Sequence, residues 1–232
     1  MAEWLSPAEW TALKLSLRVS FWATILSLPL AVMVAFVLAR GQFRGKQILN
    51  GLVHLPLILP PVVTGYLLLV LFGRRGPIGT FLEDTFGIVL AFKWTGAALA
   101  AAVMAFPLMV RAIRLAIEAV DPKLEQAAAT LGANRVWTLA VVTLPLILPG
   151  IIAGSVLAFA KAMGEFGATI TFVSNIPGQT QTLPSAIYAY LQVPGGDPAA
   201  FRLVVVSIFV AVVALLISES VAKRVARRIA GT

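Results

Sequence analysis

Long apolar stretches constrain this chain more than any other feature of its sequence. A helix that crosses the hydrocarbon core of a bilayer needs about 20 predominantly apolar residues. The sequence holds five apolar stretches of about that length, joined by shorter polar or basic segments. We therefore predict an all-α fold, a polytopic membrane helical bundle of about five transmembrane helices. The expected spans are 15–39, 48–72 (interrupted by Pro56, Pro60 and Pro61), 86–110, 148–172 and 201–222.

The composition supports a membrane protein and leaves little room for an enzyme. Charged residues make up 12% of the chain, about half of what soluble domains carry. After five spans too few residues remain for a catalytic domain, so we expect one transmembrane domain over 1–232. The sequence has no cysteine and a single histidine, which excludes disulfides and a multi-histidine metal site. We interpret His54 as an interior histidine rather than a ligand, and we expect no metal site.

The basic residues predict how the bundle is oriented. The net charge of +8 comes from short clusters between apolar runs, which favours a membrane explanation over nucleic-acid binding. Lysine and arginine accumulate on the cytoplasmic side of membrane proteins. With five spans, the three most basic segments (40–47, 111–138 and 223–232) fall on one side. We therefore expect a multi-pass protein of the bacterial inner membrane, with the N-terminus outside and the C-terminus in the cytoplasm.

The longest charged segment contains the signals of a short helix. Asp121-Pro122 is typical of a helix N-cap and first residue, and Gly132 is typical of a C-terminal stop. The apolar residues between them share one face, made shallow by two alanines. A helix this short is marginal alone and needs a surface to pack on. Periodicity leaves open whether that surface is its own bundle or a partner. The face comprises Leu124, Ala127, Ala128 and Leu131.

The same segment resembles the cytoplasmic loop motif of bacterial ABC importer permeases. That motif reads Glu-Ala-Ala, three residues, Gly, nine residues, Ile, any residue, Leu-Pro, and both spacings match here. Glutamine replaces the usual glutamate, with Glu125 one residue earlier, and valine replaces isoleucine. Either Glu125 or Gln126 could therefore make the polar contact. The matching residues are Gln126, Ala127, Ala128, Gly132, Val142, Leu144 and Pro145.

This resemblance implies a function, a fold and a set of partners. It implies the type I ABC importer permease fold, with a coupling helix in the loop at about 121–138 that docks into a cytoplasmic ATPase subunit. The ATPase, not this chain, would bind ATP-Mg, so no cofactor is expected here. The permease would pair with a second copy, receive substrate from an extracytoplasmic binding protein and contact membrane lipid. A channel or membrane scaffold is the rival class. The loop motif argues against both, because neither needs a docking site for an ATPase.

Three further segments indicate the substrate class. Residues 54–65, 72–79 and 164–178 resemble the molybdate permease subunits, and sulfate and tungstate permeases are their close relatives. The resemblance therefore implies import of an oxyanion, with molybdate the first candidate and tungstate or sulfate the alternatives.

Polar residues late in the fourth span are the candidates for a pathway or gate. Lys161 and Glu165 lie four residues apart and can pair on one helix face. Charges at membrane depth are costly and often mark a pathway, but a structural ion pair explains this one equally well. Neutral donors further along the span could pass an anion through weak sites or could simply pack helices. The candidates are Lys161, Gly164, Glu165, Gly167, Thr169, Thr171, Ser174 and Asn175.

Overall fold

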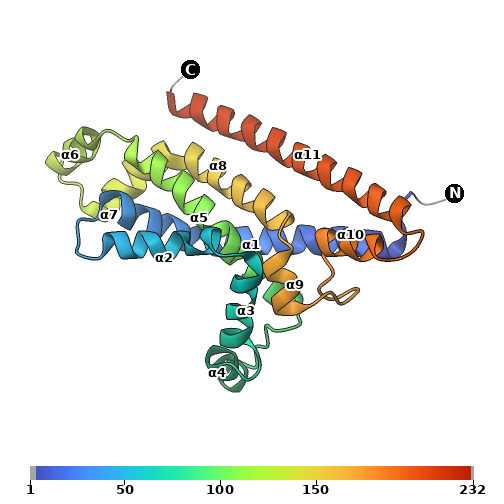
Figure 1. The fold of residues 1–232 in the computed structure, drawn as a ribbon. Coiled ribbons are helices and arrows are strands. Elements are labelled where there is room, and N and C mark those ends of the chain that lie inside the picture. The colour runs from blue at the N-terminus through green and yellow to red at the C-terminus, as the bar shows by residue number, and fades with distance from the viewer. Residues whose placement is uncertain (1–3, 231–232) are drawn as a thin grey trace.

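The computed structural model describes residues 4–230, and every regular element in that range is a helix (Figure 1). Four helices are long and apolar enough to cross a membrane, or five if one sharply bent pair counts as a single span. The predicted all-α bundle of about five spans is therefore confirmed. The N-terminus lies at the end of the bundle opposite helix α6 (Pro122–Thr130), and helix α11 (Asp197–Ala230) runs back toward the α6 end. The side chains of the basic tail lie outside the described residues: Lys223, Arg224, Arg227 and Arg228.

The first span is longer than predicted. Helix α1 runs over Pro7–Arg40, and its start is fixed by a capping box in which Ser6 accepts a hydrogen bond from the Glu9 backbone and donates its own N–H to the Glu9 carboxylate. This reciprocal cap satisfies two backbone donors that would otherwise lack partners. Residues 7–14, which lie outside the predicted span 15–39, therefore belong to the same helix.

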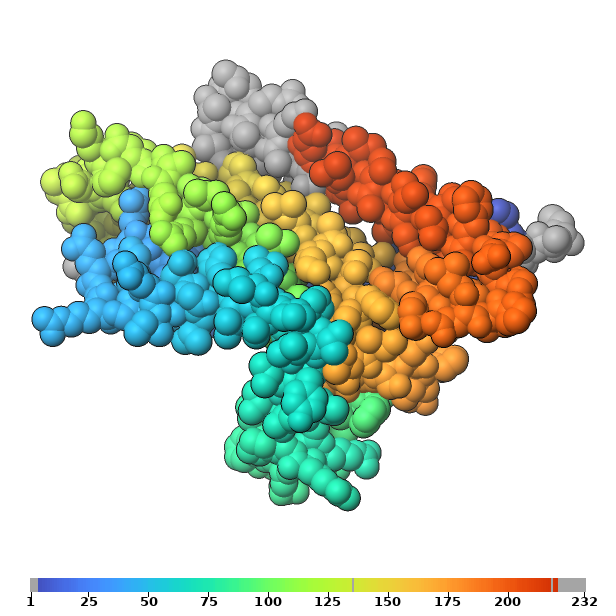
Figure 2. Space-filling model, viewed as in Figure 1, coloured from blue at the N-terminus to red at the C-terminus, as the bar shows by residue number. Residues whose placement is uncertain are grey.

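The second span breaks where its prolines are densest. Helix α2 (Lys46–Ile58) and helix α3 (Pro61–Phe72) meet at an angle of 112°. Leu59, between them, is extended, the conformation that the ring of Pro60 favours for the residue before it. Helix α4 (Pro77–Phe86) follows. Together α3 and α4 project from the body of the molecule, as the cyan and teal part of Figure 2 shows.

The third span lies further along the chain than predicted. Helix α5 runs over Trp94–Glu118, not 86–110, because the apolar residues 88–92 form a loop instead of the first turns. Arg111 and Arg114, expected in the cytoplasmic loop, therefore belong to α5. In the most apolar window of α5, 61% is buried, against 17–28% for the other three long helices. This helix is the centre of the bundle.

The fourth span starts earlier and ends earlier than predicted. Helices α7 (Arg135–Thr138) and α8 (Leu144–Met163) flank a π-helical turn, Leu139–Thr143. They form one helical run that includes Pro145 and Pro149. The helix is interrupted at residues 164–166, and a short helix, α9 (Gly167–Val173), follows. The predicted continuous span 148–172 is therefore wrong. The prolines near its start are tolerated, and the glycine-containing segment near its end is where the helix stops.

The last two helices return to the start of the chain. Helix α10 (Leu183–Leu191) packs against α1, where the Leu183 backbone N–H donates to the Ser16 hydroxyl over 2.6 Å. Helix α11 (Asp197–Ala230) contributes Arg202, whose guanidinium donates to the fully buried Glu9 carboxylate over 2.8 Å. These two contacts join elements far apart in sequence at the end of the bundle opposite α6.

Helices α5 and α8 approach closely because small residues face each other. An added Cβ on Gly150 of α8 would come within 2.2 Å of the Ala116 Cβ of α5, and one on Gly154 within 3.2 Å of the Ala112 Cβ. Small residues four apart on both helices let the backbones pack tightly. In lipid there is no hydrophobic driving force between helices, so this van der Waals packing holds them together.

This contact predicts a position-specific loss of stability. We expect Gly150→Val to cost about 1–3 kcal/mol by overpacking, which lowers the melting temperature by about 3–10 °C for a chain of this size. Gly51→Val is the matched control, because nothing lies within 4 Å of a Cβ there. Thermal unfolding of the purified protein in detergent measures both. Equal melting temperatures for the two variants would show that the α5–α8 contact is not tight.

Candidate functional site: the α6 loop and the α8–α9 break

Helix α6 (Pro122–Thr130) is formed by strong caps rather than by its own length. At its start, the Asp121 carboxylate accepts a hydrogen bond from the Lys123 N–H over 2.9 Å. At its end, Gly132 takes a left-handed φ of +87°, and the N–H groups of Gly132 and Ala133 donate to Ala129 and Ala128. These bonds constitute a Schellman motif, which requires the left-handed residue that glycine supplies most easily. The expected N-cap and stop residues therefore act as such.

An open groove lies between the end of α6 and the start of the α7–α8 run. Its volume is about 380 Å³, and its walls are mostly small or apolar residues. Leu131 is 89% exposed and Trp137 is 61% exposed. Apolar side chains concentrated on an exposed surface mark an interaction site. The lining residues are Ala128, Leu131, Gly132, Ala133, Asn134, Trp137, Val141 and Val142.

Glu125 ties α6 to the membrane-spanning helices. One carboxylate oxygen accepts from the Arg40 guanidinium at the end of α1 over 3.2 Å and from the Thr143 hydroxyl in the π-helical turn over 3.0 Å. Arg40 also donates to the Val120 carbonyl over 3.1 Å. One carboxylate thus joins α6 to α1 and to the π-helical turn. Glu125, and not the exposed Gln126, makes the polar contact within this chain.

The predicted coupling residues therefore divide into groups. Ala128, Gly132 and Val142 line the groove. Gln126 and Ala127 are exposed on α6, whereas Glu125 faces the bundle. Leu144 and Pro145 lie outside the groove, in the first turn of α8, so the second half of the motif is part of the span.

Sequence reasoning missed Arg40 and Thr143 as partners of the loop helix. In the sequence, Arg40 is only one of several basic residues after the first span, and nothing local distinguishes it as a partner of Glu125. Thr143 carried a local signal, because it is a single hydroxyl within the apolar run 139–148. The ion pair of Arg40 and Glu125 joins residues 85 positions apart, and no local pattern predicts such a pair.

The proposed gate residues gather around the break between α8 and α9. Lys161 Nζ lies 2.8 Å from a Glu165 carboxylate oxygen, and the other oxygen accepts from the Ala168 N–H over 3.1 Å. Glu165 is 3% exposed. Both oxygens of this buried carboxylate have donors, and its second contact caps the start of α9. This geometry favours the structural ion pair over a direct anion ligand.

The remaining candidates lie along α9 and the residue pair after it. Gly164 ends α8, and Gly167 packs against Pro61 at the start of α3. Thr169 is buried, and the Thr171 hydroxyl donates to its own helix at Gly167 over 2.8 Å. Ser174 ends α9 with a φ of +65° and is exposed. Asn175 follows Ser174 directly, and its amide donates to the Ser185 carbonyl over 3.4 Å. The helix that carries most of these residues, α9, packs against α3 and is separate from α8, so they do not lie at the end of a continuous span.

The chain matches a family model over residues 27–230, that of the binding-protein-dependent transport system inner membrane component. The chain belongs to this family. It is therefore a transport permease subunit of the inner membrane, and the family implies two kinds of partner, an ATPase and a substrate-binding protein.

Several similar proteins align with nearly the whole chain. The molybdenum transport system permease protein ModB of Escherichia coli K12 is 61% identical over 98% of this chain and 99% of its own length. The ModB protein of Haemophilus influenzae is 53% identical over 95% of this chain and 96% of its own length. The sulfate transport system permease protein CysT of Escherichia coli K12 is 33% identical over 97% of this chain and 81% of its own length.

Solved structures confirm the fold. A bacterial alginate ABC transporter in complex with a pentasaccharide-bound periplasmic protein matches with a TM-score of 0.71 and 22% identity, covering 97% of this chain and 80% of that one. The MetNI methionine ABC transporter in an inward-facing conformation matches with a TM-score of 0.66 and 15% identity, covering 94% of each chain. The ABC importer permease fold expected from the sequence is therefore correct.

The Glu125 anchor makes a testable prediction about local stability. We expect Glu125→Ala to loosen α6, because hydrogen bonds to charged groups contribute about 1.5–3 kcal/mol and the Arg40 guanidinium would lose its carboxylate. Hydrogen exchange of the α6 backbone amides should accelerate about tenfold or more. Gln126→Ala is the matched control on the exposed side of the same turn, and it should leave exchange unchanged. Equal exchange in both variants would remove Glu125 as the anchor.

Proposed function

We propose that this permease imports molybdate through the inner membrane as part of an ATP-driven importer. The observation that carries the substrate assignment is the 61% identity over nearly the whole length to a molybdenum permease, against 33% for a sulfate permease. Relatives with the same named substrate at 53% and 61% identity support the same anion. Tungstate and sulfate, which share the tetrahedral oxyanion geometry, are the alternatives that the experiment below distinguishes.

The proposed coupling site is the α6 groove. An ATPase subunit, which binds ATP-Mg, would insert an apolar edge against Ala128, Leu131 and Val142 and cover side chains that are exposed in the lone chain. Movement of α6 would reach α1 through Arg40 and the α7–α8 run through Thr143, because Glu125 bonds to both. Differential contacts of this kind in two states are what a conformational cycle requires.

The proposed pathway lies beside α9 and α3, between two copies of the chain. Ser174, which is exposed, and Thr171 and Asn175, which are half-buried, offer hydroxyl and amide groups without a net charge, which suits transient contact with a dianion. Thr169 is buried and would support the pathway only by packing. Lys161 and Glu165 would act on this pathway indirectly, by fixing the break from which α9 leaves α8. A homodimer is proposed because the arm formed by α3 and α4 leaves much apolar surface uncovered in the single chain.

The coupling proposal predicts the effect of one added side chain. In a reconstituted complex with the cognate ATPase and binding protein, Ala128→Arg should abolish substrate-stimulated ATP hydrolysis, because the groove is too small for an arginine and its partner together. Ala129→Arg is the matched control, since Ala129 is exposed on the same helix and does not line the groove. Stimulation by molybdate-loaded binding protein is the measurement, with tungstate and sulfate in parallel.

Each outcome of this experiment has a definite meaning. Loss of stimulation in Ala128→Arg alone, with the complex still assembled by size-exclusion chromatography, supports the dock. Full stimulation in both variants would contradict it. Stimulation of the wild type by sulfate alone would leave the proposed ATPase docking site in place and would show that molybdate is not the substrate.

The proposed orientation is tested by cysteine labelling, which is simple because the chain has no cysteine of its own. Ala8→Cys at the start of α1 and Lys123→Cys on α6 are both exposed and lie at opposite ends of the bundle. We expect a membrane-impermeant maleimide to label Ala8→Cys in intact spheroplasts and Lys123→Cys only after lysis. The reverse pattern would invert the orientation.

A further inference from the structure

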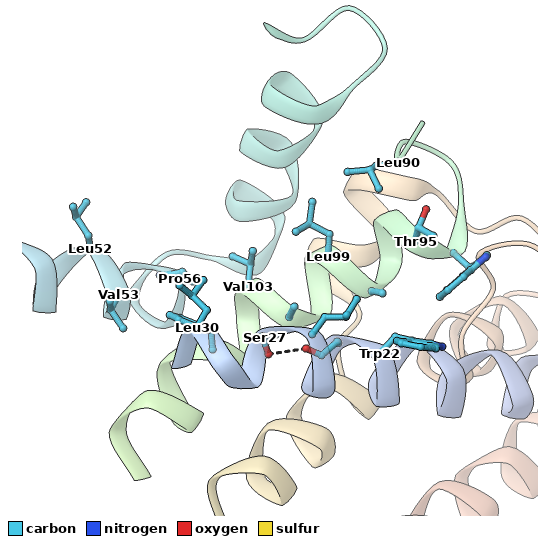
Figure 3. Close-up of a pocket in the computed structure, with 16 residues that line it drawn as sticks. Trp22, Ser27, Leu30, Leu52, Val53, Pro56, Leu90, Thr95, Leu99 and Val103 are labelled. Atoms are coloured by element: carbon cyan, nitrogen blue, oxygen red, sulfur yellow. Dashed lines mark hydrogen bonds between the residues drawn. The ribbon is translucent and has the colours of Figure 1, made fainter. Parts of the chain in front are cut away.

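A large apolar groove opens on a face of the bundle far from the α6 groove. It has a volume of about 810 Å³ and lies between α1, α2 and α5, within the size range of sites that hold small ligands, about 300–1,000 Å³. Figure 3 shows Leu52, Val53 and Pro56 of α2 at one end and Trp22 and Thr95 at the other. The Ser27 hydroxyl within it donates to the Ala23 carbonyl of its own helix over 2.6 Å, so the middle of the groove presents hydrocarbon.

The two ends of the groove differ in chemistry. The end beside α2 is aliphatic, whereas the other end carries the indole rings of Trp22 and Trp94. Two cationic residues adjoin them, one by contact and one in sequence. The Arg18 guanidinium stacks over the Trp94 ring at 3.8 Å from its centroid, and Lys93 immediately precedes Trp94 as the N-cap of α5. Tryptophan and basic residues at one end of an apolar surface are typical of the membrane–water interface.

The charges at this end have no acidic partner within the described part of the chain. The ion pairs of that part involve Arg40, Arg114, Lys161 and Arg202, and neither Arg18 nor Lys93 belongs to one. Both side chains are exposed. An occupant with a negative charge at one end and a hydrocarbon chain at the other would therefore complement the whole site.

The described residues of the chain leave this groove open. A second copy of this basic chain would bring cations toward Arg18 and Lys93 unless a carboxylate happened to face them. Phospholipid is the solvent of the spanning helices, and an anionic headgroup would pair electrostatically with the exposed cations Arg18 and Lys93.

We propose that this groove is a binding site for an anionic phospholipid, with one acyl chain along α1 and α5 and its phosphate at Arg18 and Lys93. Each buried methylene group of the acyl chain would contribute to the binding free energy of the lipid, and the two cations would select an anionic headgroup. The site is separate from the α6 groove and from the α8–α9 break, so it holds a structural lipid and not the transported anion.

The test is lipid binding to the assembled complex of permease and ATPase. Delipidated complex in mild detergent is titrated with phosphatidylglycerol and with phosphatidylcholine of the same acyl chains, and bound lipid is counted by native mass spectrometry. We expect wild-type complex to prefer phosphatidylglycerol. The double substitution Arg18→Gln, Lys93→Gln should reduce that preference about tenfold or more, whereas Arg74→Gln, Arg75→Gln, two exposed cations in the turn after α3, should leave it unchanged.

A second variant tests the apolar part of the site. Val103→Trp fills the groove and should abolish binding of phosphatidylglycerol at this site while the complex keeps its mass and melting temperature. Equal binding of the two lipids by the wild type would overturn the proposal, as would unchanged binding in Val103→Trp. If Val103→Trp instead separates the permease copies, a second copy occupies the groove and the lipid assignment is wrong.

Discussion

The alanine-rich helix α5 is the element on which the rest of the fold depends. It packs along both α1 and α8, and it is the most buried of the long helices. In lipid, apolar side chains gain little by facing one another, so close packing of small residues must hold the bundle together. Ala112 and Ala116 of α5 meet Gly150 and Gly154 of α8 with no space for larger groups. The broken helices α2/α3 and α8/α9 are tolerated because this rigid centre supports them.

Charged contacts are arranged around this centre at its two ends. Arg40 and Glu125 join α1 to α6 at one end, and Glu9 and Arg202 join α1 to α11 at the other. Both pairs connect segments that lie far apart in sequence, and both use α1. The same helix therefore contacts the element that we propose as the ATPase dock and the helix that ends the chain, and a shift at one end has a continuous helix through which to act.

Much of this arrangement was predictable from the sequence, and the failures have physical causes. Apolar length gives the number of spans, and Asp121 and Gly132 define α6, because caps are local chemistry. Boundaries failed where hydropathy and backbone conformation disagree. Residues 88–92 are apolar but form a loop with Phe92 at a φ of +60°. Pro145 lies within a helical run because the π-helical turn before it changes the hydrogen-bond register. Glu125 and its partners required tertiary structure.

The length of α1 has a consequence for the membrane in which this protein resides. Its 34 residues extend about 51 Å, whereas the hydrocarbon core of a bilayer is about 30 Å thick. The surplus must be absorbed by tilt or by turns that emerge into the headgroup layer. Glu9 lies in the first turn of α1, where such emergence relieves the dielectric penalty on its buried carboxylate. A helix with spare length can also meet a thinner or thicker bilayer by letting more or fewer terminal turns emerge, so hydrophobic mismatch is absorbed at the ends of α1 and not in the packed centre.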